Sequence, residues 1–282
     1  MPPLVDYTDS DSDSESASGA PEAVPEKSKK AEEQKKEKVS DLPPLPSKFH
    51  DVYTTAPRRS TSDDPSLHEG RKRQTPHKQG TWPTHVYIEW HCDSIEHNTI
   101  SRFVAKAGQA AVKVSPTFKL NTHLTSDLGS DLPLHLSLSR PNTLETEQKV
   151  RFMDLLESAI ENSGIRRFSI KFTGFEWVRN QNATRWFLVM KAAAATVKKD
   201  ELIKLLLGCN RVFEVFNQPG LDGLGSSGFH VSIAWTLEEP TKELKTAVER
   251  ALESELSALS SLALYADVVK VKMGNAVKII NI

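Results

Sequence analysis

The sequence predicts an α+β fold with two similar lobes, mainly antiparallel sheets that face a central cleft, and helices on the outside. Strand-like segments outnumber helix-like segments, and neighbouring strands lie close enough in the chain to form hairpins. In addition, a pattern of histidine and serine alternating with apolar residues occurs once in each half of the expected folded part. Two lobes around a cleft are the simplest arrangement that brings both copies together.

The first 78 residues are predicted to be a disordered tail. They contain an acidic, serine-rich run over residues 7–15, a mixed charge run over 27–38 and a stretch rich in Pro and Ser over 42–76. Such segments bury too little apolar surface to offset the entropy lost on ordering. We therefore expect one folded domain over residues 79–282.

The composition limits the classes of protein to consider. Of the 282 residues, 38% are hydrophobic and 26% are charged, which is typical of a globular protein. The formal net charge of −1 does not indicate a nucleic-acid binder, so any groove for a polyanion must be local. Cys92 and Cys209 lie far apart, which argues against a disulfide framework or a Cys-rich zinc site. The chain has no apolar run of about 18 residues, so we expect no membrane span and a reducing compartment, cytosol or nucleus.

Hydrophobic periodicity gives the expected order of elements. Alternation predicts a strand over residues 84–90, and helical spacing predicts a helix around 100–107. Asn142 and Glu145 resemble a capping box that opens another helix, which ends near Gly164. The other expected elements are strands over 134–139, 168–172, 185–190, 229–235, 268–273 and 277–282, helices over 202–216 and 244–252, and loops over 115–132 and 219–228.

The first copy of the histidine–serine pattern lies in the predicted strand over residues 134–139. Because strand side chains alternate between faces, its three leucines lie on one face and His135 and Ser137 on the other. His97 and His123 are also followed two positions later by a threonine. Neither is flanked by alternating apolar residues, so alternation rather than spacing distinguishes the pattern.

The second copy lies in the predicted strand over residues 229–235. Four apolar residues, Trp235 among them, are expected on one face, with His230 and Ser232 on the other. A single histidine on a half-buried strand is commonly an ordinary polar residue. Two such strands, one in each half, are better explained as the two sides of a phosphodiester-cleaving site.

Together these segments resemble the two-histidine (2H) phosphoesterase superfamily, and within it the eukaryotic U6 small nuclear RNA 3′-end-processing phosphodiesterases. The double motif is specific to the superfamily, and the flanking stretches favour this branch. The resemblance spans about residues 80–282 and is carried by residues 80–87, 135–139, 180–181 with 184–185, 229–235 and 273–275.

The resemblance implies a bilobal fold with pseudo-twofold symmetry and a metal-independent 3′–5′ exoribonuclease that acts on uridine-rich RNA 3′ ends in the nucleus. It implies single-stranded RNA as the partner, and we expect a monomer without a cofactor. Asn180 and Gln181 are predicted to border the substrate. Members of the family carry a tyrosine shortly before the second motif that stacks on a nucleobase, whereas the loop over 219–228 has no aromatic residue.

Two histidines and two serines suffice for RNA cleavage, in which the adjacent 2′-hydroxyl is the nucleophile. A neutral histidine can remove its proton and a protonated one can donate to the departing 5′-oxygen, because the histidine pKa lies near neutrality. The hydroxyls of Ser137 and Ser232 can donate to the phosphoryl oxygens. We assign His135 as the base and His230 as the acid, although the sequence supports the pair and not the order. The product would be a 2′,3′-cyclic phosphate or, after opening, a 3′-phosphate.

Three alternatives stay open. The first is a 2H cyclic nucleotide phosphodiesterase for small substrates, and the second is a non-catalytic RNA-binding module with the same fold. A third, a zinc protein using His85, His91 and His97, has loose ligand spacing and no Cys or Asp set nearby.

Overall fold

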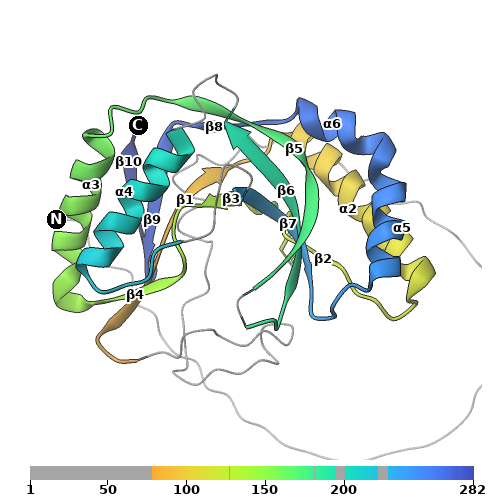
Figure 1. The fold of residues 1–282 in the computed structure, drawn as a ribbon, viewed down its shortest axis with the longest axis horizontal. Helices are drawn as coiled ribbons and strands as arrows, with labels where there is room; N and C mark the ends of the chain where they lie inside the picture. Colours follow the sequence, from red (N-terminus) through yellow and green to blue (C-terminus); the bar gives the residue numbers. More distant parts are fainter. Residues whose placement is uncertain (1–77, 127, 181, 195–200, 222–227) are drawn as a thin grey trace, which may run out of the picture. The chain divides into compact units, whose positions relative to one another are not determined.

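A single antiparallel sheet forms the centre of the fold. The computed structural model describes residues 78–126, 128–180, 182–194, 201–221 and 228–282. Its strands are β1 (Thr81–Trp90), β2 (Asn121–Thr122), β3 (Leu134–Ser137), β4 (Asn142–Glu145), β5 (Phe168–Arg179), β6 (Trp186–Ala194), β7 (His230–Thr236), β8 (Ala263–Ala266), β9 (Val268–Met273) and β10 (Ala276–Asn281). They are ordered β10–β9–β1–β3–β7–β6–β5–β8, with β2 paired to β7 and β4 to β1 (Figure 1). All these pairings are antiparallel.

Helices flank the sheet in two groups. They are α2 (Ser94–Val114), α3 (Lys149–Glu161), α4 (Glu201–Val215), α5 (Lys242–Leu252) and α6 (Leu256–Ser261), with short 3₁₀ helices at Thr146–Gln148 and Glu253–Glu255. Figure 1 shows α3 and α4 together beside β9 and β10, and α2, α5 and α6 together beyond β5 to β7. The predicted α+β class with mainly antiparallel strands is confirmed. Two lobes with pseudo-twofold symmetry stay a prediction, because the described strands form one continuous sheet.

The hydrophobic core lies between the sheet and these helices. Leu134, Leu136 and Leu138 of the first predicted motif are at most 1% exposed and belong to it. Phe152 of α3 and Phe213 of α4 pack together within the same core, with ring centroids 4.8 Å apart. The alternation read from the sequence therefore fixes which face of β3 is buried.

The segment from Asn142 to Glu145 corrects one prediction. It is strand β4, paired with β1, rather than the start of a helix, and α3 begins at Lys149. The Asn142 amide donates to the carbonyl of Pro219 at 3.0 Å, and Leu144 is fully buried. Burial of Leu144 at the sheet edge thus outweighs the local capping signal. The predicted loop over 115–132 also contains a short strand, β2.

Several predictions fall outside the described residues. These are residues 1–77 of the predicted tail and residues 222–227 of the predicted loop over 219–228. The boundary between tail and domain therefore stays a prediction. In the part of the chain that the structure does describe, no helix is long and apolar enough to cross a bilayer.

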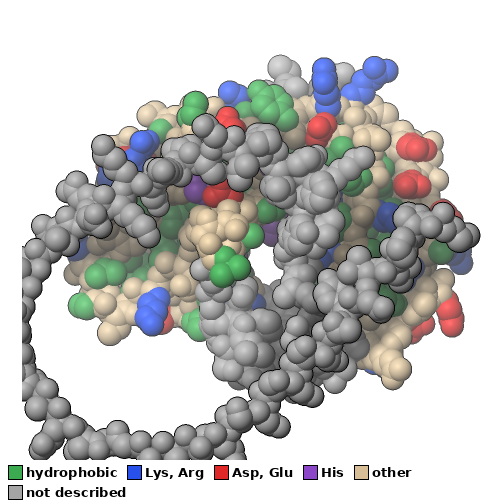
Figure 2. All heavy atoms as spheres, turned by 180° about the vertical axis from the view of Figure 1, so that it is seen from behind, with side chains coloured by type: hydrophobic (Ala, Val, Ile, Leu, Met, Phe, Trp, Pro, Cys, Tyr) green, Lys and Arg blue, Asp and Glu red, His purple; other side chains and the backbone are tan. Residues whose placement is uncertain are grey.

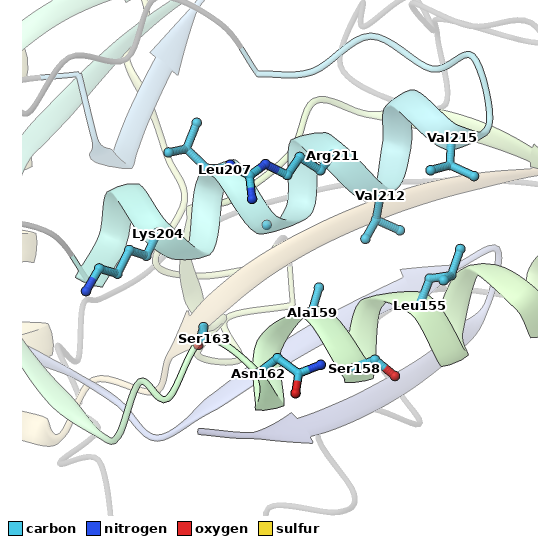
Figure 3. Close-up of a pocket in the computed structure, with 11 residues that line it drawn as sticks. Leu155, Ser158, Ala159, Asn162, Ser163, Lys204, Leu207, Arg211, Val212 and Val215 are labelled. Carbon is cyan, nitrogen blue, oxygen red and sulfur yellow. The ribbon is translucent and has the colours of Figure 1, made fainter.

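The outer surface carries charges of both signs. Figure 2 shows Lys, Arg, Asp and Glu side chains interspersed on one face of the molecule, in keeping with the near-zero net charge. A groove of about 510 Å³ lies between α3 and α4, and its lining includes the exposed residues Leu207 and Val215 as well as Lys204 and Arg211, all on α4 (Figure 3). None of the predicted site residues lines this groove.

Candidate active site

The two histidine–serine strands are neighbours at the centre of the sheet. β3 and β7 pair through Leu136 and Val231, whose side chains are fully buried in the core. Alternation sends the flanking histidine and serine side chains of both strands to the opposite side of the sheet, which we term the site face.

The register of this pair places the four side chains crosswise. Counting out from the Leu136–Val231 pair, His135 lies opposite Ser232 and Ser137 lies opposite His230. The two imidazoles thus lie on a diagonal, where Cβ atoms are about 7 Å apart, enough to admit a phosphate group between the rings. His135 is exposed and the other three are half-buried. The structure therefore brings together the four residues that the sequence singled out.

His230 is oriented by the backbone before it. Its Nδ1 lies 2.9 Å from the carbonyl oxygen of Gly228. Because a carbonyl only accepts hydrogen bonds, Nδ1 carries the proton and donates. Nε2 is consequently the nitrogen that can take up or deliver a proton.

His135 is held in a different environment. Desolvation by its surroundings lowers the pKa of His135 below its ordinary value, and the charges of His230 and Lys272 act in the same direction. The carboxylate of Glu89, directly opposite on β1, acts against them. Although His135 is exposed, the lowered pKa favours the neutral imidazole near pH 7, the form that accepts a proton.

β1 adds two aromatic side chains to the site face. The Nε2 atom of His85 lies 3.1 Å from Oγ of Ser137, and the ring centroids of His85 and Tyr87 lie 5.4 and 5.6 Å from that of His135. Burial, followed by the charges of His135 and Lys272, lowers the pKa of His85 to about 3. His85 is therefore neutral at physiological pH and acts as a fixed hydrogen-bond partner of Ser137.

Glu89 is the anionic centre of a small buried network. Its carboxylate pairs with Lys270 on β9 and lies 2.6 Å from Nε2 of His91. The Glu89 and Lys270 side chains are only 7% and 8% exposed. Burial alone would raise the pKa of Glu89, but the hydrogen bonds of His91 and Lys270 lower it below its ordinary value. A fixed negative charge therefore faces His135.

Three lysines border the site face. Lys270 and Lys272 lie opposite Tyr87 and His85, and Lys191 of β6 lies opposite His230. Lys191 also pairs with Glu176 at 3.4 Å. Lysine side chains thus lie beside the histidines, and two of the three are paired with carboxylates.

Comparisons with known proteins identify the family of this chain. A family model described as HVSL, an uncharacterised conserved protein, matches residues 43–281. U6 snRNA phosphodiesterase 1 of Neurospora crassa is 34% identical over 269 residues, which cover 85% of this chain and 74% of that relative. This chain belongs to the U6 snRNA phosphodiesterase 1 family.

More distant comparisons extend over the same region. The human U6 snRNA phosphodiesterase 1 is 23% identical over 281 residues, with 97% of this chain and 96% of the relative covered. The solved structure of Kluyveromyces marxianus Usb1 with uridine monophosphate superposes with a TM-score of 0.56 at 15% identity, covering 72% of this chain and 99% of that chain. This likeness supports the same fold.

The remaining predicted site residues lie in the hairpin between β5 and β6. The Asn180 side chain accepts hydrogen bonds from the backbone of Thr184 and Arg185 and donates to the Thr184 hydroxyl. Its amide is therefore engaged in the turn. Gln181 lies outside the described residues, and substrate contact by this family member through either residue stays a prediction.

The three histidines of the zinc alternative do not converge. His91 lies 2.6 Å from Glu89, and His97 lies 3.2 Å from Asp131. His85 is engaged with a serine instead. Over the described ranges, no group of three or more His, Cys, Asp or Glu side chains is placed to hold a metal ion.

Proposed function

We propose that this chain trims the uridine-rich 3′ end of U6 small nuclear RNA by metal-independent acid–base transesterification. As a member of its family, the chain is an RNA phosphodiesterase. The observation that carries the proposal is the crosswise register of His135 with Ser232 and of His230 with Ser137 on one side of β3 and β7. This arrangement offers a proton acceptor, a proton donor and two hydroxyls to a single phosphate.

His135 is assigned as the base. It takes the proton of the 2′-hydroxyl on the penultimate nucleotide, and the 2′-oxygen then attacks the phosphorus. The lowered pKa of His135 supports this role, because a base must be neutral before it acts. Glu89 opposite the ring favours the imidazolium that forms as the proton is transferred.

His230 is assigned as the acid. Its Nδ1 donates to Gly228, so Nε2 carries the transferable proton in the imidazolium form and delivers it to the departing 5′-oxygen. The bond between the phosphorus and that oxygen breaks, leaving a 2′,3′-cyclic phosphate on the retained RNA. Opening of the ring to a 3′-phosphate would use the same two histidines in exchanged roles.

The serines and lysines stabilise the charge on the phosphoryl oxygens. The hydroxyls of Ser137 and Ser232 donate to the non-bridging oxygens. Lys191 and Lys272 supply positive charge near them, which favours the negatively charged transition state. The proposal places this monomeric enzyme in the nucleus, where its RNA substrate is processed.

The test is to incubate purified full-length protein with oligouridylate-tailed RNA in the presence of a metal chelator. Mass spectrometry of the products should show stepwise loss of 3′-terminal uridines and ends that carry a 2′,3′-cyclic phosphate or a 3′-phosphate. Products with 3′-hydroxyl ends, or activity that the chelator abolishes, would contradict the mechanism.

The same preparation also separates the alternatives. Hydrolysis of small cyclic nucleotides without RNA trimming would identify an enzyme for small substrates. RNA binding without any cleavage would identify a non-catalytic module, which the retention of histidine and serine in both strands argues against.

A further inference from the structure

The site face continues past the catalytic pairs onto β6 and the end of β7. Ile233 is an extra residue in β7, so Val189 lies opposite Ser232 while Phe187 lies opposite Trp235. The bulge resets the alternation and turns Trp235 toward the site face. Val189 and Trp235 are 0% and 2% exposed, yet neither belongs to the core cluster of the described residues.

Four side chains gather at this end of the site face. The rings of His123, which directly follows β2, and of Phe187 from β6 are stacked, with centroids 6.0 Å apart and planes inclined by 14°. The guanidinium carbon of Arg185 lies 5.9 Å from the centroid of the Phe187 ring and 5.8 Å from that of Trp235. We term these four residues the Phe187 platform. His123, Arg185 and Phe187 are half-buried, so each presents part of its surface.

The hairpin turn fixes the cationic part of the platform. Oδ1 of Asn180 accepts the backbone N–H of Arg185 at 3.1 Å, and the Asn180 N–H donates to the Arg185 carbonyl at 3.0 Å. These bonds hold the Arg185 backbone where its side chain meets the two rings. Asn180 is thus a positioning residue for the platform.

The platform lies on the His135 side of the catalytic pairs. On β7, Ser232 lies between His135 of β3 on one side and Val189 of β6 on the other. Phe187 is two residues from Val189, which is about 7 Å along β6. His230 lies at the opposite end of β7. In the proposed mechanism His135 acts on the 2′-hydroxyl of the nucleotide on the 5′ side of the scissile phosphate. The platform is therefore on the side of the retained, 5′ part of the RNA.

We propose that the Phe187 platform binds the nucleotide on the 5′ side of the scissile phosphate in a single-stranded RNA. The Phe187–His123 ring pair would carry the base, since every base has an apolar face that stacks on aromatic rings. Arg185, held by the two rings, would contact the phosphate on the 5′ side of that nucleotide. The inference rests on the proposed function, and its test separates the two.

The first experiment measures trimming of oligouridylate RNA that is intact or lacks the base of the penultimate nucleotide. Wild-type protein should lose roughly ten-fold or more in rate on the abasic RNA. The Phe187→Ala and His123→Ala variants should trim both RNAs at nearly the same reduced rate. Tyr265→Ala, which removes a 71% exposed aromatic residue from β8, is the matched control and should discriminate like wild type.

Two results would overturn the platform while leaving the function intact. One is a wild-type enzyme that trims both RNAs equally. The other is a pair of folded variants, checked by thermal melting, that discriminate as strongly as wild type. Failure of the wild-type protein to trim any RNA would instead overturn the proposed function itself.

A second experiment tests Arg185 through salt dependence. Each phosphate contact of a single strand contributes roughly 0.7 to the slope of log affinity against log salt. Arg185→Ala should lower the slope for oligouridylate binding by about that amount, whereas Arg185→Lys should keep it. An unchanged slope in Arg185→Ala would remove the phosphate contact from the proposal.

Discussion

The two catalytic strands carry the same motif in different surroundings. On β3, His135 faces the buried carboxylate of Glu89, and Ser137 is held by His85. On β7, His230 is instead held by a backbone carbonyl. One sequence pattern therefore presents two imidazoles whose neighbours differ in charge. We therefore propose that the adjacent strands, and not the motif itself, decide which histidine acts as base and which as acid.

Removing either histidine should have the largest effect on activity. His135→Ala and His230→Ala should each lower the trimming rate roughly 10²- to 10⁴-fold, since each removes one proton transfer. His97→Ala, which also removes a histidine followed by a hydroxyl residue two positions later, should behave like wild type.

A substrate with sulfur in place of the leaving 5′-oxygen tests which of the two histidines is the acid. A thiolate leaves without protonation, so this RNA should restore much of the activity of His230→Ala and little of that of His135→Ala. Rescue of His135→Ala instead would exchange the assigned roles.

The two serines are expected to have the next largest effect. Ser137→Ala and Ser232→Ala should each reduce kcat by roughly 10²-fold, because one donor to the phosphoryl oxygens is lost. KM for the RNA should change little, since the donation strengthens in the transition state. A variant that raised KM at constant kcat would show a binding role instead.

The charge of Glu89 should appear in the pH profile. Its carboxylate raises the pKa of His135, so Glu89→Gln should lower that pKa and move the acid limb of kcat/KM to lower pH. In the wild type this limb should already lie below the ordinary histidine value. An acid limb that stays in place, in protein shown to be folded, would separate Glu89 from the base.

Substitution of His85 should have the smallest effect. We expect it to change the stability of the protein and not the assigned proton transfers. Its pKa is about 3 in the folded protein against an ordinary value of 6.5, so below pH 6.5 the unfolded chain binds a proton that the folded protein does not. This lowers the stability of the wild type as the pH falls toward 3. His85→Gln has no imidazole at this position and does not lose stability in this way, so its thermal melting temperature should approach or exceed that of wild type as the pH falls. A constant difference between the two proteins would contradict the assignment.

The four side chains of the two histidine–serine strands could be predicted from the sequence to lie on the face away from the core, because alternation decides which side chains share a strand face. His135, Ser137, His230 and Ser232 follow from the burial of the apolar residues between them. The same reasoning applied to the polar positions of β1 would have identified His85.

Other features depend on pairing that local pattern does not contain. Strict alternation predicts Trp235 on the apolar face of its strand, but the bulge at Ile233 turns it toward the site face. Glu89 reaches His135 only through the register between β1 and β3, from 46 positions away in sequence. Asn142 reads locally as a helix cap, yet its pairing with β1 places it in a strand.

The most direct test of the account is trimming of an oligouridylate RNA whose penultimate 2′-hydroxyl is replaced by hydrogen. The wild-type protein should remove no nucleotide at that linkage, because the group that His135 deprotonates is the nucleophile. Cleavage of the deoxy linkage at the rate of the unmodified RNA would contradict the two-histidine mechanism.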